Sequence, residues 1–143
     1  MVWYEMLEKG QAGFTKLISA ICLKELQALV AISENIQAAF VATAHGYELA
    51  SVISSKISSE KLASITVSMH GLGEAVVSEA MLKYCTNVTI EAENGKVVML
   101  AIADTRDELL LSILADAHVP LGQILWSGRQ CAERISVKLA HRV

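Results

Sequence analysis

The sequence predicts an α+β fold of three layers: a five-stranded antiparallel sheet, one long helix on one face, and the first and last helices on the other. Segment 61–84 repeats apolar residues every three or four positions, as a long helix does. Short connections join strand-like segments before and after this helix, which is typical of an antiparallel sheet. Segments 36–43, 96–103 and 108–115 are apolar on both faces, so helices must cover both sides of that sheet.

The chain begins with two helical patterns. Residues 1–9 could form a short amphipathic helix, which two nearby glycines would end. A helix is also expected over 14–32, but its apolar stripe changes phase near Cys22, so either it bends or its halves touch different surfaces. We therefore expect residues 1–22 to be a helical extension and residues 23–143 to be the domain.

Turn and cap signals place the first hairpin and the start of the long helix. Strands 36–43 and 48–54 are expected to join through a tight turn, in which Gly46 supplies a positive φ. Ser58 or Ser59 can accept a hydrogen bond from the first turn of the long helix.

The second half of the chain predicts a meander followed by a helix. Residues 87–93 alternate apolar and polar side chains, so this strand is expected to be covered on one face and to lie at an edge. Asn94-Gly95 is the strongest hairpin signal in the chain. Pro120 suits the first turn of a last helix over 121–139.

The long helix has two nearly uncharged faces. The broader one is apolar and is expected to pack on the sheet; it comprises Leu62, Ile65, Thr66, Met69, Leu72, Val76, Val77 and Ala80. The opposite one carries small residues, namely Ser64, Val67, Ser68, Gly71, Ala75 and Ser78. Because small side chains let another backbone come close, we expect a second copy of the chain to pack on this face.

Composition limits the class of protein. A chain of 143 residues fits one domain, and a net charge of −3 argues against nucleic-acid binding. Cys22, Cys85 and Cys131 have no metal or redox spacing, so we expect reduced, core-filling thiols in a cytoplasmic protein. Neither a signal peptide nor a membrane-spanning run is expected.

No pattern of residues indicates catalysis, a metal or a cofactor. The histidines lack ligand spacing, the serines of 51–59 lack a nucleophile elbow, and the glycines at 71 and 73 do not form a phosphate loop. The sharpest enzymatic hypothesis is an arginine finger, for which Arg106 is the only plausible donor. Trp126 is expected in the core rather than at a binding surface.

The order of elements and several short segments resemble the roadblock/dynein light-chain family, over about residues 26–139. The first hairpin carries the segments Ala38 to Tyr47 and Glu48-Leu49-Ala50-Ser51, with His45 in place of the usual acidic residue or Asn. The remaining matches are Lys61-Leu62-Ala63-Ser64, Leu72-Gly73-Glu74, Asn94-Gly95 and Leu121-Gly122.

The resemblance implies a homodimer whose long helices lie side by side and whose edge strands pair. The implied dimer interface comprises Ser64, Ser68, Gly71, Ala75, Ser78, Val88 and Ile90. It also implies a non-enzymatic cytoplasmic module that regulates or scaffolds a small Ras-like GTPase. Helix geometry places the candidate contacts with this partner at Val67, His70 and Glu74, with further candidates at Gly71 and Ser78. The alternatives are an assembly scaffold without a GTPase partner and a small-molecule sensor.

Overall fold

The predicted strands form one five-stranded antiparallel sheet, with strand order β2-β1-β5-β4-β3. The structure is a computed structural model that describes residues 2–54, 56–103 and 108–141, with side chains described from residue 15 onward. The strands are β1 (Ile36–Ala42), β2 (Glu48–Ile53), β3 (Asn87–Ala92), β4 (Gly95–Ala101) and β5 (Leu110–Asp116). The expected meander and the expected edge position of β3 are confirmed.

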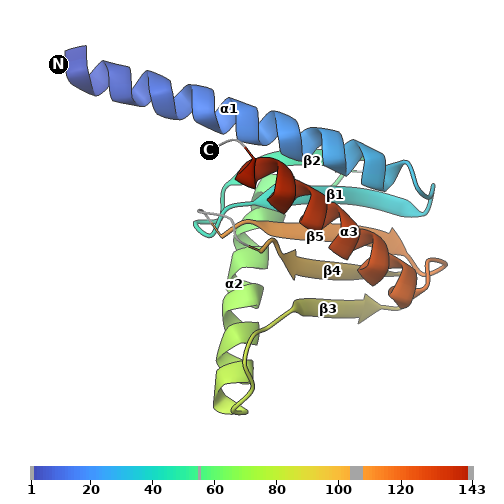
Figure 1. The fold of residues 1–143 in the computed structure, drawn as a ribbon. Helices are drawn as coiled ribbons and strands as arrows, with labels where there is room; N and C mark the ends of the chain where they lie inside the picture. The colour runs from blue at the N-terminus through green and yellow to red at the C-terminus, as the bar shows by residue number, and fades with distance from the viewer. Residues whose placement is uncertain (1, 55, 104–107, 142–143) are drawn as a thin grey trace.

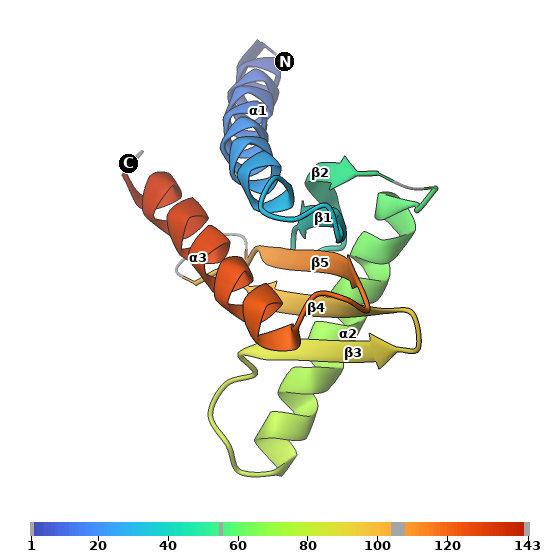
Figure 2. The ribbon, with the colours of Figure 1, turned by 90° about the vertical axis from the view of Figure 1, so that its right-hand side faces the viewer.

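Three helices complete the predicted layers. They are α1 (Val2–Val30), α2 (Ser59–Glu79) and α3 (Leu121–Ala140). Helix α2 crosses one face of the sheet, whereas α1 and α3 pack against each other on the opposite face (Figures 1 and 2). The three-layer α+β arrangement predicted from the doubly apolar strands is therefore correct.

The two faces of the sheet bury very different cores. The side that faces α1 and α3 carries the main cluster, which includes Leu26, Val41, Leu111, Ile113, Ile124 and Ile135. The α2 side buries only a small cluster around Phe40, Ala42 and Ala63. Since a fully buried large apolar side chain stabilises a fold by about 1.5–3 kcal/mol, α1 and α3 hold the sheet more firmly than α2 does.

Helix α1 is one continuous helix rather than two. Gly10 and Gly13 do not end it, although a helical glycine costs about 1 kcal/mol relative to alanine. The apparent change of phase arose because Leu17 and Leu23 face outward, with 48% and 37% of their surface exposed. The helix runs through residues 22 and 23, so the domain boundary expected there stays a prediction.

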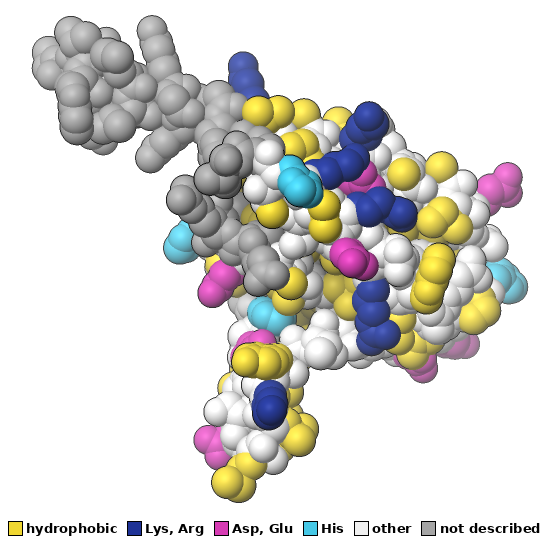
Figure 3. All heavy atoms as spheres, viewed as in Figure 1, with side chains coloured by type: hydrophobic (Ala, Val, Ile, Leu, Met, Phe, Trp, Pro, Cys, Tyr) yellow, Lys and Arg dark blue, Asp and Glu magenta, His cyan; other side chains and the backbone are white. Residues whose placement is uncertain are grey.

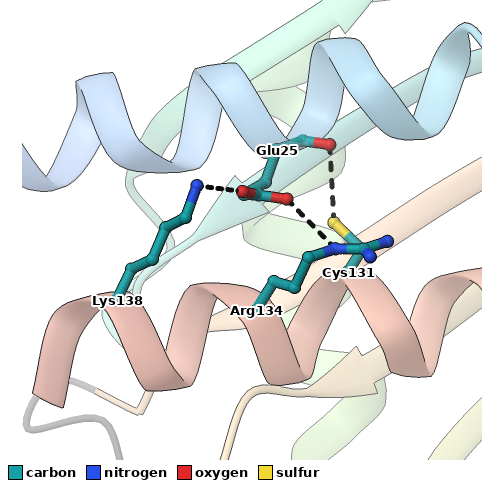
Figure 4. A network of polar contacts seen from close by, with 4 residues as sticks. All are labelled: Glu25, Cys131, Arg134 and Lys138. Carbon is teal, nitrogen blue, oxygen red and sulfur yellow. Dashed lines mark hydrogen bonds and ion pairs between the residues drawn. The ribbon is translucent and has the colours of Figure 1, made fainter.

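A buried carboxylate joins α1 to α3 (Figure 4). The Glu25 side chain is 7% exposed, lies 3.4 Å from Arg134 Nε, and accepts a hydrogen bond from Lys138 Nζ. Cys131 Sγ also donates to the Glu25 carbonyl oxygen, at 3.7 Å. Sequence reasoning missed this contact, because the described side chains that bind Glu25 lie more than 100 residues further along the sequence.

The three cysteines are free and buried, as the sequence predicts. Burial raises the pKa of Cys22 to about 11, and burial together with the nearby Glu25 raises the pKa of Cys131 to about 12. Desolvation disfavours a thiolate, so both thiols stay neutral at physiological pH and act as small apolar side chains.

The turn signals place most element ends correctly. Gly46 has φ +85°, and the Ser58 side chain accepts the Lys61 backbone N–H at 3.4 Å. The hairpin between β3 and β4 is off by one residue, because Gly95 already pairs with Ala92 and only Glu93 and Asn94 form the turn.

Candidate functional site: the outer face of α2 and the edge of β3

Small residues bring α2 close to the sheet. Ala63 and Thr66 are its buried residues, and the Thr66 hydroxyl lies 3.2 Å from that of Ser112 in β5. Further along, a Cβ at Gly73 would lie 2.9 Å from Cys85 Sγ and 3.0 Å from a Val88 methyl carbon. This spacing leaves no room for large side chains along the line of closest approach.

The prediction for the broad apolar face of α2 is therefore wrong at several positions. Ile65, Leu72 and Val76 were expected against the sheet but are 53%, 61% and 68% exposed. Ala80 is exposed as the C-cap, whereas Thr66 is buried as predicted. A helix with two apolar sides has an ambiguous phase, and here the smaller residues make the contact.

The outward side of α2 combines these large residues with the predicted small ones. We call it the outer face of α2; it comprises Ser64, Ile65, Ser68, Gly71, Leu72, Ala75, Val76 and Ser78, all exposed in the single chain. A Cβ at Gly71 would meet nothing within 4 Å. The outer face is thus uncharged, apolar along its centre, and open to another molecule.

The apolar surface continues past the end of α2. The helix ends at Glu79 rather than near residue 84, and Met81 then takes a left-handed φ of 61°. Met81, Leu82 and Tyr84 are 93%, 65% and 80% exposed. This end of α2 projects beyond β3, and apolar and uncharged side chains dominate its surface (Figures 1 and 3). Contiguous exposed apolar surface of this kind marks an interaction site.

Strand β3 lies beside this projection and pairs only with β4 within the described sheet. Val88 is half-buried below α2, whereas Ile90 is 40% exposed. A groove of about 190 Å³ adjoins Ile90, Val97 and Leu114. An edge strand next to an apolar groove offers both hydrogen-bonding groups and side-chain contacts to a partner.

A larger pocket opens along the other flank of α2. The α2 pocket has a volume of about 470 Å³ and is lined by Val67, His70, Gly71 and Glu74 of α2, together with Ala44, Ala101, Ile102, Glu108, Leu109 and Leu110. It thus brings together the three predicted partner contacts, Val67, His70 and Glu74. Sequence reasoning missed Glu108, which lies two residues before β5 and has a left-handed φ of 46°.

Polar groups inside the α2 pocket are only partly paired. His70 Nε2 lies 3.7 Å from Glu74 Oε1, which also accepts the Cys85 backbone N–H at 3.3 Å. His70 Nδ1 is buried and has no hydrogen-bond partner among the described residues. A buried nitrogen without a partner is costly, so this atom is suited to meeting a polar group from outside.

Other candidate residues stand apart from this site. Trp126, expected in the core, is 65% exposed on α3, at the opposite face of the sheet. Arg106 lies outside the described residues. Across the described ranges, no three His, Cys, Asp or Glu side chains gather to hold a metal ion. No helix in the same ranges is long and apolar enough to cross a membrane.

These elements define a roadblock/LC7 fold: a five-stranded antiparallel sheet with α2 on one face, α1 and α3 on the other, and β3 at the edge. Among solved structures, MglB of Myxococcus xanthus is similar with a TM-score of 0.72 and 18% identity, covering 91% of this chain and 92% of that one. Gliding protein MglB of Thermus thermophilus matches with a TM-score of 0.72 and 14% identity, covering 84% and 89%.

A roadblock/LC7 domain of Streptomyces avermitilis matches with a TM-score of 0.74 and 12% identity, covering 82% of this chain and 97% of that one. No family model and no curated protein matches the sequence. The resemblance inferred from residues 26–139 is confirmed at the level of the fold.

Proposed function

We propose that this protein is a non-enzymatic cytoplasmic homodimer that binds and regulates a small Ras-like GTPase. The outer face of α2 is the observation that carries the proposal. Ile65, Leu72 and Val76 are each more than half exposed in the single chain. Such residues stabilise a protein only when another surface covers them, and an uncharged helix can lie directly against its own copy.

A second copy can cover both parts of the exposed surface. The end of α2 projects past β3, so a copy that pairs with this edge also meets the projecting helix (Figures 1 and 2). Residues Val88 and Ile90 of β3 would then join Ser64, Ser68, Gly71, Ala75 and Ser78 of α2 at the interface. The same surface patch serves both copies, as twofold symmetry requires.

The solved structures are consistent with assembly, and the family resemblance gives the proposal its partner class. One similar structure is titled as MglB with a tetrameric arrangement, and another is MglC of Myxococcus xanthus. The family resemblance described above assigns GTPase regulation to such domains. In this chain, Val67, His70 and Glu74 line a pocket on the flank of α2 that a GTPase could contact.

Regulation in this proposal needs no catalytic residue from the chain. Contact with α2 can order the switch segments of a GTPase and so place the partner's own catalytic groups. The arginine finger at Arg106 is the competing mechanism, and Arg106→Ala separates the two: contact regulation survives the change, whereas a finger loses on the order of 10³-fold in rate.

The proposal is tested with the Ras-like GTPases of the same genome, each loaded with a GTP analogue or with GTP. We expect one of them to bind and its hydrolysis rate to change. Gly71→Arg should abolish both effects, because the new side chain occupies the outer face without a clash inside the protomer. Gly122→Arg on α3 is the matched control, since it too has no neighbour within 4 Å.

Two outcomes would contradict the proposal. Gly122→Arg could prove as damaging as Gly71→Arg, which would place the binding surface elsewhere. Alternatively, no GTPase binds, and the captured proteins are structural or transport components with unchanged nucleotide turnover. That second outcome would select an assembly scaffold instead.

A further inference from the structure

The lining of the α2 pocket is acidic. Glu74 and Glu108 both line it, and its described lining residues include no Lys or Arg. Two carboxylates without an opposing charge among the described lining residues, in a partly enclosed site with low-dielectric walls, create a negative potential that attracts a cation.

His70 adds an acceptor to these carboxylates. Nε2 lies 3.7 Å from Glu74 Oε1, so the tautomer with its proton on Nε2 points that proton toward the carboxylate. In this tautomer, the buried Nδ1 carries a lone pair that no described group uses. The pocket therefore presents two carboxylates and one nitrogen acceptor, and it calls for a ligand with several N–H donors.

The rest of the lining is apolar. Val67 of α2, Ala101 at the end of β4 and Leu110 at the start of β5 surround the polar groups. A side chain with an apolar stem and a charged head fits such a site, because the stem covers apolar surface while the head meets the acceptors.

We propose that the α2 pocket receives an arginine side chain of the protein partner. A guanidinium offers five N–H donors in a fixed plane and can meet acceptors on different sides at once, whereas a lysine ammonium is a compact point charge. This inference rests on the proposed function for the identity of the partner, but the chemistry of the pocket can be measured without that partner.

The first test measures the pocket alone. The full ¹⁵N-labelled chain is titrated with N-acetyl-arginine amide, and with N-acetyl-citrulline amide as the neutral control of the same size. We expect saturable shifts of the backbone amide signals of Val67, Gly71 and Leu110 with the arginine compound only. The Glu74→Gln/Glu108→Gln double variant should bind it at least tenfold more weakly.

Equal shifts with citrulline, shifts confined to other parts of the chain, or no shift at all would each overturn the proposal. Glutamine keeps an acceptor oxygen for the Cys85 N–H, so the double variant removes charge while preserving that hydrogen bond.

The second test uses the GTPase that binds the wild-type chain. The double variant should weaken the Kd at least tenfold and reduce its dependence on salt, while Glu60→Gln, on α2 but outside the pocket lining, should not. One partner arginine should show coupling with the double variant in a mutant cycle.

The outcomes separate the two proposals. An unchanged Kd, or a double variant that alters only dimerisation, would overturn the arginine pocket while the GTPase assignment stands. If no GTPase binds the wild-type chain, the proposed function fails, and the titration with the arginine compound still decides what the pocket accepts.

Discussion

Leu72→Ser should weaken the proposed homodimer strongly and the fold of its subunits by only about 1 kcal/mol. Leu72 is 61% exposed in the single chain, and in the proposed dimer the second copy would bury this exposed surface. Fully burying a leucine stabilises by about 2.5 kcal/mol, so the exposed part contributes about 1.5 kcal/mol. Twofold symmetry doubles this to about 3 kcal/mol, which corresponds to about a 100-fold rise in the dimer Kd.

The dimer Kd is measured by sedimentation across a concentration series, and the free energy of unfolding of the subunit by denaturant titration at low concentration. Leu17→Ser is the matched control, because Leu17 is 48% exposed on α1, at the opposite face of the sheet. It should leave the dimer Kd unchanged, whereas its buried half should make it lower the free energy of unfolding of the subunit by about 1 kcal/mol, as the buried part of Leu72 does. An unchanged Kd for Leu72→Ser, or a larger effect at Leu17, would refute the reasoning.

The remaining predictions concern stability. Gly128→Ala places a Cβ 2.6 Å from a Leu100 methyl carbon and should lower the free energy of unfolding by about 1–3 kcal/mol, whereas Gly122→Ala, with no neighbour within 4 Å, should be neutral or stabilising; denaturant titration compares them. Glu25→Gln leaves the cations of α3 without a charged partner, but both are about half exposed, so we expect a loss of only about 1–2 kcal/mol; a loss above 4 kcal/mol would contradict this. Burial raises the pKa of Cys22 to about 11 and of Cys131 to about 12, so above pH 9 these two thiols ionise in the unfolded chain before they ionise in the folded one. The contribution of the thiols to the free energy of unfolding should be fully present below pH 9 and should fall by about 1.4 kcal/mol per thiol and pH unit up to pH 11. Replacing both cysteines by Ala should remove this slope, and an unchanged slope would contradict the prediction.

Strand patterns and turn residues predicted the fold because they depend on local geometry. Two-sided apolar strands required helices on both faces, and Gly46 and the cap at Ser58 marked the ends of elements where the structure has them. The one-sided pattern of residues 87–93 likewise predicted the free edge at β3. Each of these inferences uses residues that lie near one another in the sequence.

The helix faces could not be assigned in this way. Both sides of α2 are apolar, and only the sheet beneath it decides that Ala63 and Thr66 are buried while Leu72 and Val76 are exposed. Glu25 resembled a surface residue because its partners lie on α3, more than 100 residues away in the sequence.

The α2 pocket shows the same limit. Helical spacing alone placed Val67, His70 and Glu74 on one flank, and in the structure all three line one pocket; their contact with a partner stays a prediction. Glu108 has no such signal, because it reaches the pocket only through the pairing of β5 with its neighbours. The acidic character of the pocket therefore emerges only in three dimensions.

Sedimentation equilibrium of the wild-type chain tests most directly the central claim, that a second copy of the chain covers the outer face of α2. The proposed dimer interface and the proposed GTPase contacts both lie on this helix. We expect a mass of twice the 15.4 kDa of one chain at micromolar concentration. A mass that stays at 15.4 kDa in concentrated solution would contradict the account.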